Sequence, residues 1–193
     1  MTKRTGYLEV IAGPMFCGKT EELIRQVKRA VIGKKRVQVF KHTLDKRYGS
    51  ERKLYSHAGI TFDSDLVSGA AELLKLVRPD TEIVAIDEAQ WFGETLVPVV
   101  GKLLEKGYHV LVAGLAMTFD RQPFTPVPAL MALSDRVTKL SAVCSICGAD
   151  AVYHKRVTAK GPKVDPLKAD PGFVSKMDAS VFQARCRDCY RKK

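Results

Sequence analysis

The stretch Gly13-Pro14-Met15-Phe16-Cys17-Gly18-Lys19-Thr20 decides the fold. It follows an apolar run at residues 7–12, precedes a helical stripe, and matches the P-loop pattern G-x-x-x-x-G-K-[ST] in full. Such a loop curls so that successive N–H groups point at phosphate oxygens, and the next helix turns its positive end to the same place. A bare match also arises by chance in an ordinary turn, so the flanking strand and helix are what favour phosphate binding. We expect the whole stretch to bind a nucleotide, with Lys19 at the β- and γ-phosphates and Thr20 as a Mg²⁺ ligand.

Around this loop, β-rich runs alternate with helical patterns up to about Leu140. The alternation is typical of a parallel sheet covered by helices, and near-continuous apolar runs fit strands buried on both faces. Strands are expected at residues 7–12, 36–41, 83–86, 110–113 and 137–140, and helical stripes at 23–31, 70–77 and 96–104. Residues 43–64 and 116–128 break the alternation and are expected to be long loops, which are often functional. The predicted fold class is therefore α/β.

Two carboxylates, Asp87 and Glu88, follow the expected strand at 83–86. Ligands of α/β folds bind beyond the carboxyl ends of the strands, so Asp87 can meet Lys19 there and hold Mg²⁺. A second carboxylate beside that site can accept a proton from an attacking hydroxyl. Glu88 is thus a candidate general base, and the alternative is that it merely caps a helix beginning near Gly93.

Four of the five cysteines form two Cys-x-x-Cys pairs, Cys144 with Cys147 and Cys186 with Cys189. Four thiolates are the ligand set of a closed, structural zinc site, whereas chance or redox pairing is the alternative. The composition shifts near Ser141, so we expect a P-loop domain over residues 1–141 and a zinc-binding domain over 142–193. The fifth cysteine, Cys17, would lie at a helix N-terminus, which lowers a thiol pKa, and is expected to be accessible and partly activated.

The composition is that of an ordinary globular protein, with 193 residues, 46% hydrophobic and 27% charged. The net charge of +11 favours anionic partners, which include nucleotides, nucleic acid and acidic proteins. Basic residues cluster at 28–36, 47–53 and 185–193, where a solvated surface is the plainer explanation. No apolar run reaches the roughly 18–20 residues that span a bilayer, and no secretory signal is recognisable. We therefore expect a cytosolic protein with reduced thiols and no membrane partner.

These residues in this order resemble the zinc-containing thymidine kinases of bacteria and animals, and the resemblance covers nearly the whole chain. Besides the P-loop it is carried by Asp87-Glu88-Ala89-Gln90 and by Val137-Thr138-Lys139-Leu140 before the first cysteine pair. It implies a RecA-like sheet domain and a zinc domain whose long loop, the lasso, closes over a nucleoside. It further implies ATP with Mg²⁺ as phosphate donor, thymidine as acceptor, Glu88 as base on the 5′-hydroxyl, and a homo-oligomer, commonly a tetramer.

The resemblance also implies roles for individual residues. Lys19 and Arg47 join Glu88 as catalytic residues, Asp45 and Arg47 approach the acceptor, and Asp87 and Gln90 join the P-loop in binding the nucleotide. The residues expected around the nucleoside are Met15, Trp91, Leu115, Phe119, Phe124, Phe173, Val174, Ser175, Lys176 and Phe182.

The departures from the family pattern lie at the nucleoside end. Trp91 stands where a Phe is usual, Ala116 where an Asp is usual, His154 near a usual Thr, and Phe182 in place of a Tyr. Lost hydrogen bonds weaken discrimination more than changes of apolar shape do, so we expect a looser preference for thymidine over other deoxynucleosides. The alternative is that backbone contacts from residues 173–176 still set specificity.

A hypothesis from another class is a basic, zinc-containing P-loop protein that binds nucleotide or nucleic acid without kinase activity. Glu88 favours the enzyme, because a passive nucleotide binder has no need of that carboxylate. No arginine finger is recognisable, which disfavours a motor or helicase, and nucleic acid is not the expected partner.

Overall fold

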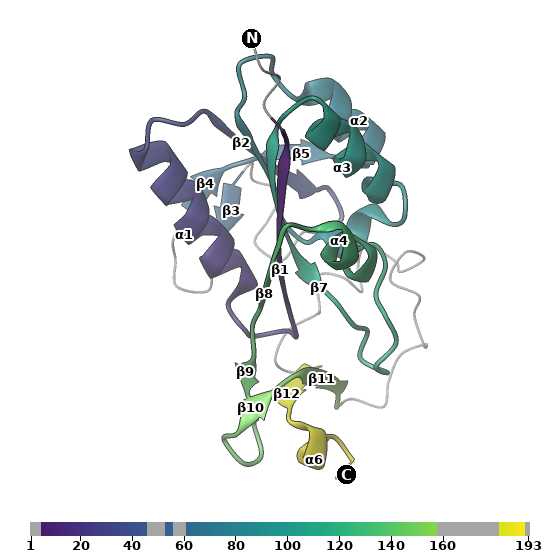
Figure 1. Cartoon of the computed structure of the whole chain (residues 1–193). Helices are drawn as coiled ribbons and strands as arrows, with labels where there is room; N and C mark the ends of the chain where they lie inside the picture. Colours follow the sequence, from purple (N-terminus) through teal and green to yellow (C-terminus); the bar gives the residue numbers. More distant parts are fainter. Residues whose placement is uncertain (1–4, 46–52, 56–60, 158–181, 192–193) are drawn as a thin grey trace.

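The computed structural model describes residues 5–45, 53–55, 61–157 and 182–191, and its main feature is a six-stranded parallel sheet (Figure 1). The strand order is β5-β2-β6-β7-β1-β8. The strands are β1 (Tyr7–Gly13), β2 (Val37–His42), β5 (Asp65–Val67), β6 (Ile83–Ile86), β7 (His109–Leu115) and β8 (Arg136–Lys139). Every neighbouring pair in the sheet is parallel, and the longest pairing runs from Tyr7 opposite His109 to Gly13 opposite Leu115. The predicted α/β fold class is confirmed.

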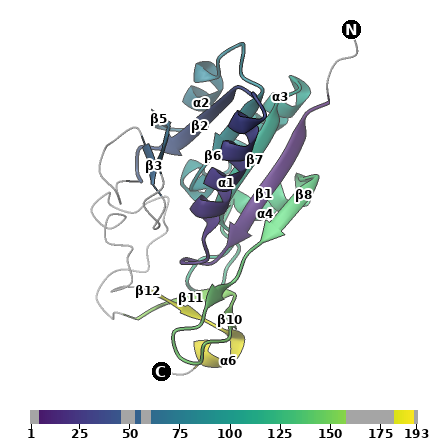
Figure 2. The ribbon, with the colours of Figure 1, turned by 90° about the vertical axis from the view of Figure 1, so that its left-hand side faces the viewer.

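Helices cover both faces of this sheet, as Figures 1 and 2 show. On one face lies α1 (Lys19–Ile32), and on the other lie α2 (Ala70–Leu76), α3 (Leu96–Glu105) and α4 (Val127–Leu133). Side chains of a strand alternate between the faces, so Leu8 and Val10 pack towards α3 and α4 while Ile11 packs towards α1. Each such aliphatic side chain contributes roughly 1.5–3 kcal/mol when fully buried, which explains why the strands are apolar on both sides.

The five expected strands are all present, but one of them is not buried as predicted. β8 is an edge strand that pairs only β1 in the sheet order, and Val137 in its middle is 41% exposed. The prediction of burial on both faces is therefore wrong for residues 137–140. The physical reason is position: a strand at the edge of a sheet lacks a neighbour and a covering layer on that side.

The stretches expected to be loops contain regular structure. α4 begins inside the proline-rich stretch, which is compatible with a proline in the first helical turn, as at Pro128. The hairpin of β3 (Lys53–Tyr55) and β4 (Thr61–Asp63) lies inside the other stretch. β5 was also missed, because a strand of three residues offers no periodicity to read.

The four clustered cysteines lie in a small module beyond the carboxyl ends of the main strands (Figure 1). We call residues 142–157 and 182–191 the cysteine module. It contains β9 (Ala142–Val143) paired with β10 (Asp150–Ala151), β11 (Tyr153–Arg156) paired with β12 (Phe182–Arg185), and the short helix α6 (Arg187–Tyr190). None of the helices in the described part of the chain has the length and apolar character needed to cross a membrane.

Candidate active site

The P-loop forms the turn between the end of β1 and the start of α1. Phe16 and Gly18 have φ angles of 66° and 80°, in the left-handed region that lets the loop curl tightly. The side chain of Lys19 is buried, and its Nζ donates a hydrogen bond of 2.7 Å to the carbonyl oxygen of Pro14. The ammonium group is thereby held inside the loop, at the start of a helix whose dipole favours anions.

Position 13 requires a glycine because neighbouring atoms lie too close to leave room for a side chain. A Cβ atom on this residue would lie 2.5 Å from the Sγ of Cys17 and 2.7 Å from the backbone oxygen of Leu140. Neither distance is tolerable, so one of the two groups would have to move. The first glycine of the P-loop is therefore required by its close contacts with Cys17 and with Leu140, the residue after β8, as well as by the motif.

Gly13→Ala should lower the free energy of unfolding by about 1–3 kcal/mol through this overlap. Gly101→Ala is the matched control, because a Cβ atom there meets nothing within 4 Å and Gly101 lies inside α3. That control should raise the free energy of unfolding by about 0.5–1 kcal/mol, since alanine favours helix. Urea unfolding measures both values, and equal effects of the two substitutions would contradict the packing at Gly13.

Thr20 and Asp87 meet although they come from different elements. Thr20 lies in the first turn of α1, and Asp87 comes immediately after β6. The Oγ1 of Thr20 donates a hydrogen bond of 3.1 Å to the Oδ2 of Asp87. Asp87 is buried. A hydroxyl and a carboxylate oxygen at the mouth of a P-loop are the donors that Mg²⁺ prefers, so this pair could hold that ion beside a nucleotide.

Glu88 has an unusual backbone conformation. Its φ and ψ of 50° and 47° are left-handed, which is uncommon for a residue with a side chain and costs roughly 1–2 kcal/mol. It precedes the short 3₁₀ helix η1 (Ala89–Phe92) without a side-chain capping bond, while α3 starts later, at Leu96, with Thr95 at its N-cap position. Glu88 thus occupies the N-cap position of η1 without a side-chain capping bond, and the helix expected to begin near Gly93 begins at Leu96 with another residue at its N-cap.

Gln90 connects the carboxylate of Glu88 to the end of β7. Its side-chain nitrogen donates to the carboxylate of Glu88, and its Oε1 accepts a 3.0 Å hydrogen bond from the backbone N–H of Leu115. Gln90 is completely buried. The amide is thus engaged at both ends and orients Glu88 relative to the strand that carries Leu115.

Half of the side chains expected around the nucleoside form one apolar cluster. Its members are Met15, Leu115, Phe119, Phe124 and Phe182. They come from the P-loop, the end of β7, the loop after β7 and the cysteine module, so residues far apart in sequence converge beside the P-loop. The rings of Phe119 and Phe182 lie 6.0 Å apart.

The other residues expected at the site are not members of this cluster. Trp91 is buried outside this cluster, and its indole nitrogen has no hydrogen-bond partner within the described residues. Arg47, Phe173, Val174, Ser175 and Lys176 lie outside the residues that the structure describes.

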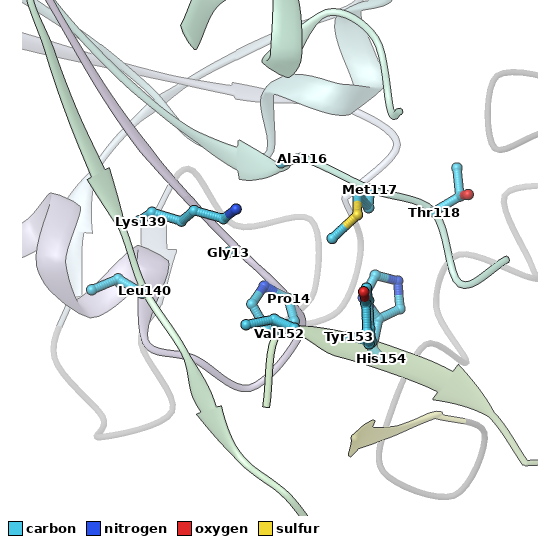
Figure 3. A pocket seen from close by; sticks show the side chains of 10 residues that line it. All are labelled: Gly13, Pro14, Ala116, Met117, Thr118, Lys139, Leu140, Val152, Tyr153 and His154. Atoms are coloured by element: carbon cyan, nitrogen blue, oxygen red, sulfur yellow. The ribbon is translucent and has the colours of Figure 1, made fainter. Parts of the chain in front are cut away.

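A pocket lies between the P-loop and the cysteine module (Figure 3). His154 forms part of its wall; the imidazole is 4% exposed and its ring lies 5.9 Å from that of Phe182. Burial, with a smaller contribution from the charge of Lys19, lowers the pKa of His154 to about 3. The imidazole is therefore neutral at physiological pH. The residues that line the pocket are Gly13, Pro14, Ala116, Met117, Thr118, Lys139, Leu140, Val152, Tyr153 and His154.

The four paired cysteines converge on one point of the cysteine module. Their sulfur atoms all lie within 4.8 Å of one another, and those of Cys147 and Cys186 are 3.7 Å apart. Zinc–sulfur bonds of about 2.3 Å in a tetrahedron place sulfur atoms roughly 3.8 Å apart. The cluster therefore fits a structural Zn²⁺ ion.

Cys17 differs from the prediction of an activated thiol. Burial raises its pKa, although the neighbouring Lys19 opposes the shift. The side chain packs against the apolar core of the cysteine module, which includes Cys144 and Cys186. The helix dipole was the correct local argument, but contact with the module removes solvent from the thiol and outweighs it.

A buried ion pair near the carboxyl end of β2 was not anticipated. The Nζ of Lys41 lies 3.2 Å from Asp45 Oδ2, and both side chains are 2% exposed. Asp45 was expected to approach the acceptor, but its partner was missed. The available signal was a lysine at the end of an apolar strand with an aspartate four residues later, a pattern that does not reveal burial.

Two comparisons with known proteins bear on this chain. A family model described as thymidine kinase matches residues 6–190. Among solved structures, the cytoplasmic domain of the Type VII secretion ATPase EccC from Thermomonospora curvata is similar, with 12% sequence identity and a TM-score of 0.44. That match covers 76% of this chain and 21% of the other, so the chain spans a small part of that protein's length.

Proposed function

The chain belongs to the thymidine kinase family, whose model covers residues 6–190, and from this membership we propose that it transfers the γ-phosphoryl group of ATP to the 5′-hydroxyl of thymidine. The products are thymidine monophosphate and ADP. The proposal includes a cytosolic location and a homo-oligomer, a tetramer by the family resemblance.

The observation that carries this proposal is the convergence of four side chains at one end of the sheet. Lys19 is held inside the P-loop, Thr20 is hydrogen-bonded to Asp87, and Glu88 follows Asp87 directly. Phosphoryl transfer needs little covalent chemistry from the protein, so it depends on positioning and on charge stabilisation. These residues would supply both.

The donor side of the reaction follows from the P-loop. Its N–H groups and Lys19 would bind the β- and γ-phosphates and stabilise the charge that develops on them. Thr20 and Asp87 would hold Mg²⁺, which neutralises the phosphate oxygens when it is bound. Phe16 and Cys17 complete the loop, and Gln90 acts by orienting Glu88.

The acceptor side depends on Glu88. Its carboxylate would take the proton of the 5′-hydroxyl while that oxygen bonds to the γ-phosphorus and the bond to the β–γ bridging oxygen breaks. The low exposure of Glu88 keeps water from competing for the phosphoryl group. Arg47 and Asp45 would also lie near the 5′-hydroxyl of the acceptor, and Asp45 is held by its ion pair with Lys41.

The nucleoside base would lie against the cluster of Met15, Leu115, Phe119, Phe124 and Phe182. Apolar and aromatic side chains with a few polar groups are typical of small-molecule sites. Trp91 and residues 173–176 complete the proposed site.

The competing proposal, a nucleotide-binding protein without kinase activity, is tested by a nucleoside panel. ATP and Mg²⁺ are incubated with thymidine, deoxyuridine, deoxycytidine, deoxyadenosine or no nucleoside, and ADP release is measured. The kinase requires release that depends on a nucleoside and yields the monophosphate in equal amount. Release that is the same without any nucleoside would favour the competitor.

Selectivity among the nucleosides is expected to be loose. Phe182 supplies a buried ring without a hydroxyl, and Ala116 carries no carboxylate, so two groups able to discriminate by hydrogen bonding are absent from these positions. The ratio of kcat/KM for thymidine to that for deoxycytidine should rise in Phe182→Tyr, by about tenfold if one hydrogen bond is gained. Strict thymidine selectivity in the unmodified protein would contradict this prediction and favour backbone contacts from residues 173–176.

A further inference from the structure

Tyr190, at the end of α6, connects the cysteine module to the loop between β7 and α4. Its hydroxyl donates a hydrogen bond of 2.5 Å to the backbone oxygen of Phe119, which is 71 residues away in sequence. The bond therefore adds a second link between the module and this loop, which already meet where the ring of Phe119 packs near that of Phe182.

The ring of Tyr190 is held from several sides. The guanidinium carbon of Arg121, from the same loop as Phe119, lies 4.8 Å from the ring centroid. Within the module, the Nζ of Lys155 donates to the backbone oxygen of Tyr190 at 3.0 Å, and the ring of Tyr153 packs edge-on at 5.3 Å. These contacts fix the direction in which the hydroxyl points.

The loop that receives this bond is itself well ordered by internal bonds. The backbone N–H of Phe124 donates to Ala116 at 3.0 Å, and that of Thr118 donates to Gln122 at 2.9 Å. These bonds tie the two sides of the loop together on either side of Phe119, so a bond at the Phe119 carbonyl restrains the tip between them. The ring of Phe119 packs on the apolar cluster beside the P-loop.

We propose that Tyr190 is a positioning residue for the nucleoside site. Its hydroxyl holds residues 116–126, which we call the Phe119 loop, against the apolar cluster beside the P-loop. The inference rests on the proposed function in assigning that cluster to the nucleoside. Tyr190 itself touches neither the P-loop nor Glu88 in any contact recorded for the described residues. Its loss should therefore weaken nucleoside binding and leave the chemical step intact.

The test compares Tyr190→Phe with Tyr7→Phe. The first substitution keeps the ring and removes only the hydroxyl. The second makes the same atomic change at the start of β1, where Tyr7 is 40% exposed and belongs neither to the cysteine module nor to the loop. A net hydrogen bond predicts a rise of about threefold to tenfold in the KM for thymidine in Tyr190→Phe, with kcat and the KM for ATP unchanged. Arg121→Gln approaches the same contact from the loop side and should raise the thymidine KM in the same direction.

Hydrogen exchange of the free proteins supplies a readout that needs no activity. Backbone amides of residues 116–124 should exchange faster in Tyr190→Phe than in the unmodified protein or Tyr7→Phe, while those of α1 should not change. Zinc content is measured in each variant to show that the module is intact. Unchanged exchange of the loop, or a fall in kcat with an unchanged thymidine KM, would overturn the proposal. An unmodified protein that phosphorylates no nucleoside would instead refute the proposed function, and the exchange experiment would still decide the role of Tyr190.

Discussion

Glu88→Gln is expected to lower kcat by about 10²–10⁴-fold while leaving the affinity for ATP nearly unchanged. The amide fills the same space and can still bond to Gln90, but it cannot accept the proton of the attacking hydroxyl. Steady-state kinetics with saturating thymidine measures kcat, and equilibrium binding of a non-hydrolysable ATP analogue measures affinity. Glu105→Gln, on the exposed side of α3, is the matched control and should keep normal turnover.

Lys19→Ala should affect ATP binding as well as turnover, unlike Glu88→Gln, which should affect turnover alone. It removes the charge that the P-loop holds against Pro14, so both analogue binding and turnover should be lost. Turnover of Glu88→Gln within a factor of a few of the unmodified protein would refute the assignment of Glu88 as base. Loss of analogue binding in Glu88→Gln would instead indicate that Glu88 supports the nucleotide.

The central sheet was predictable because its signals are local. A P-loop constrains the strand before it and the helix after it, and strands buried on both faces require apolar residues throughout. The exposure of β8 was not predictable from its residues, because Val137 looks the same in an edge strand as in a central one. Strand order decides exposure, and strand order is a property of the whole chain.

In the candidate site, too, local motifs could be predicted and contacts between distant segments could not. Lys19, Thr20 and Asp87 could be placed together because the motif puts the first two at the start of the helix after β1 and Asp87 directly follows β6, so all three lie at the carboxyl edge of the sheet. The left-handed backbone of Glu88 and its bond from Gln90 depend on the close packing of η1 against the end of β7, where a Cβ atom on Gly114 would lie 3.0 Å from Gln90 Oε1. Contacts of that kind arise between segments distant in sequence, and no local pattern records them.

Cys17 shows how such distant contacts change local chemistry. The sequence places its thiol at a helix N-terminus, whereas the fold half-buries it against the core that contains Cys144 and Cys186. The P-loop and the cysteine module are thus in direct contact at Cys17, and the module meets the Phe119 loop through Tyr190. Disorder in the module should therefore reach both the donor and the acceptor side of the proposed site.

Replacing Cys186, one of the four cysteines that could hold zinc, is expected to disrupt the module while the P-loop domain stays folded. The module's apolar core is formed largely by alanines and by the cysteines themselves, which bury too little area to fold alone. Structural zinc supplies on the order of 10 kcal/mol to such units, so Cys186→Ser should lose the metal and the ordered pairing of β11 with β12. Because β12 carries Phe182 and α6 carries Tyr190, the KM for thymidine should rise by at least about tenfold, the effect of losing roughly 1.4 kcal/mol of binding.

The large sheet has its own two cores, so circular dichroism should show most of the helix signal retained. Cys17→Ser is the matched control for zinc content, because it makes the same atomic change against the same core outside the ligand set, and it should keep about one zinc per chain. Elemental analysis that finds no zinc in the unmodified protein, or equal zinc in Cys186→Ser, would show that the four sulfur atoms converge for a reason other than metal binding.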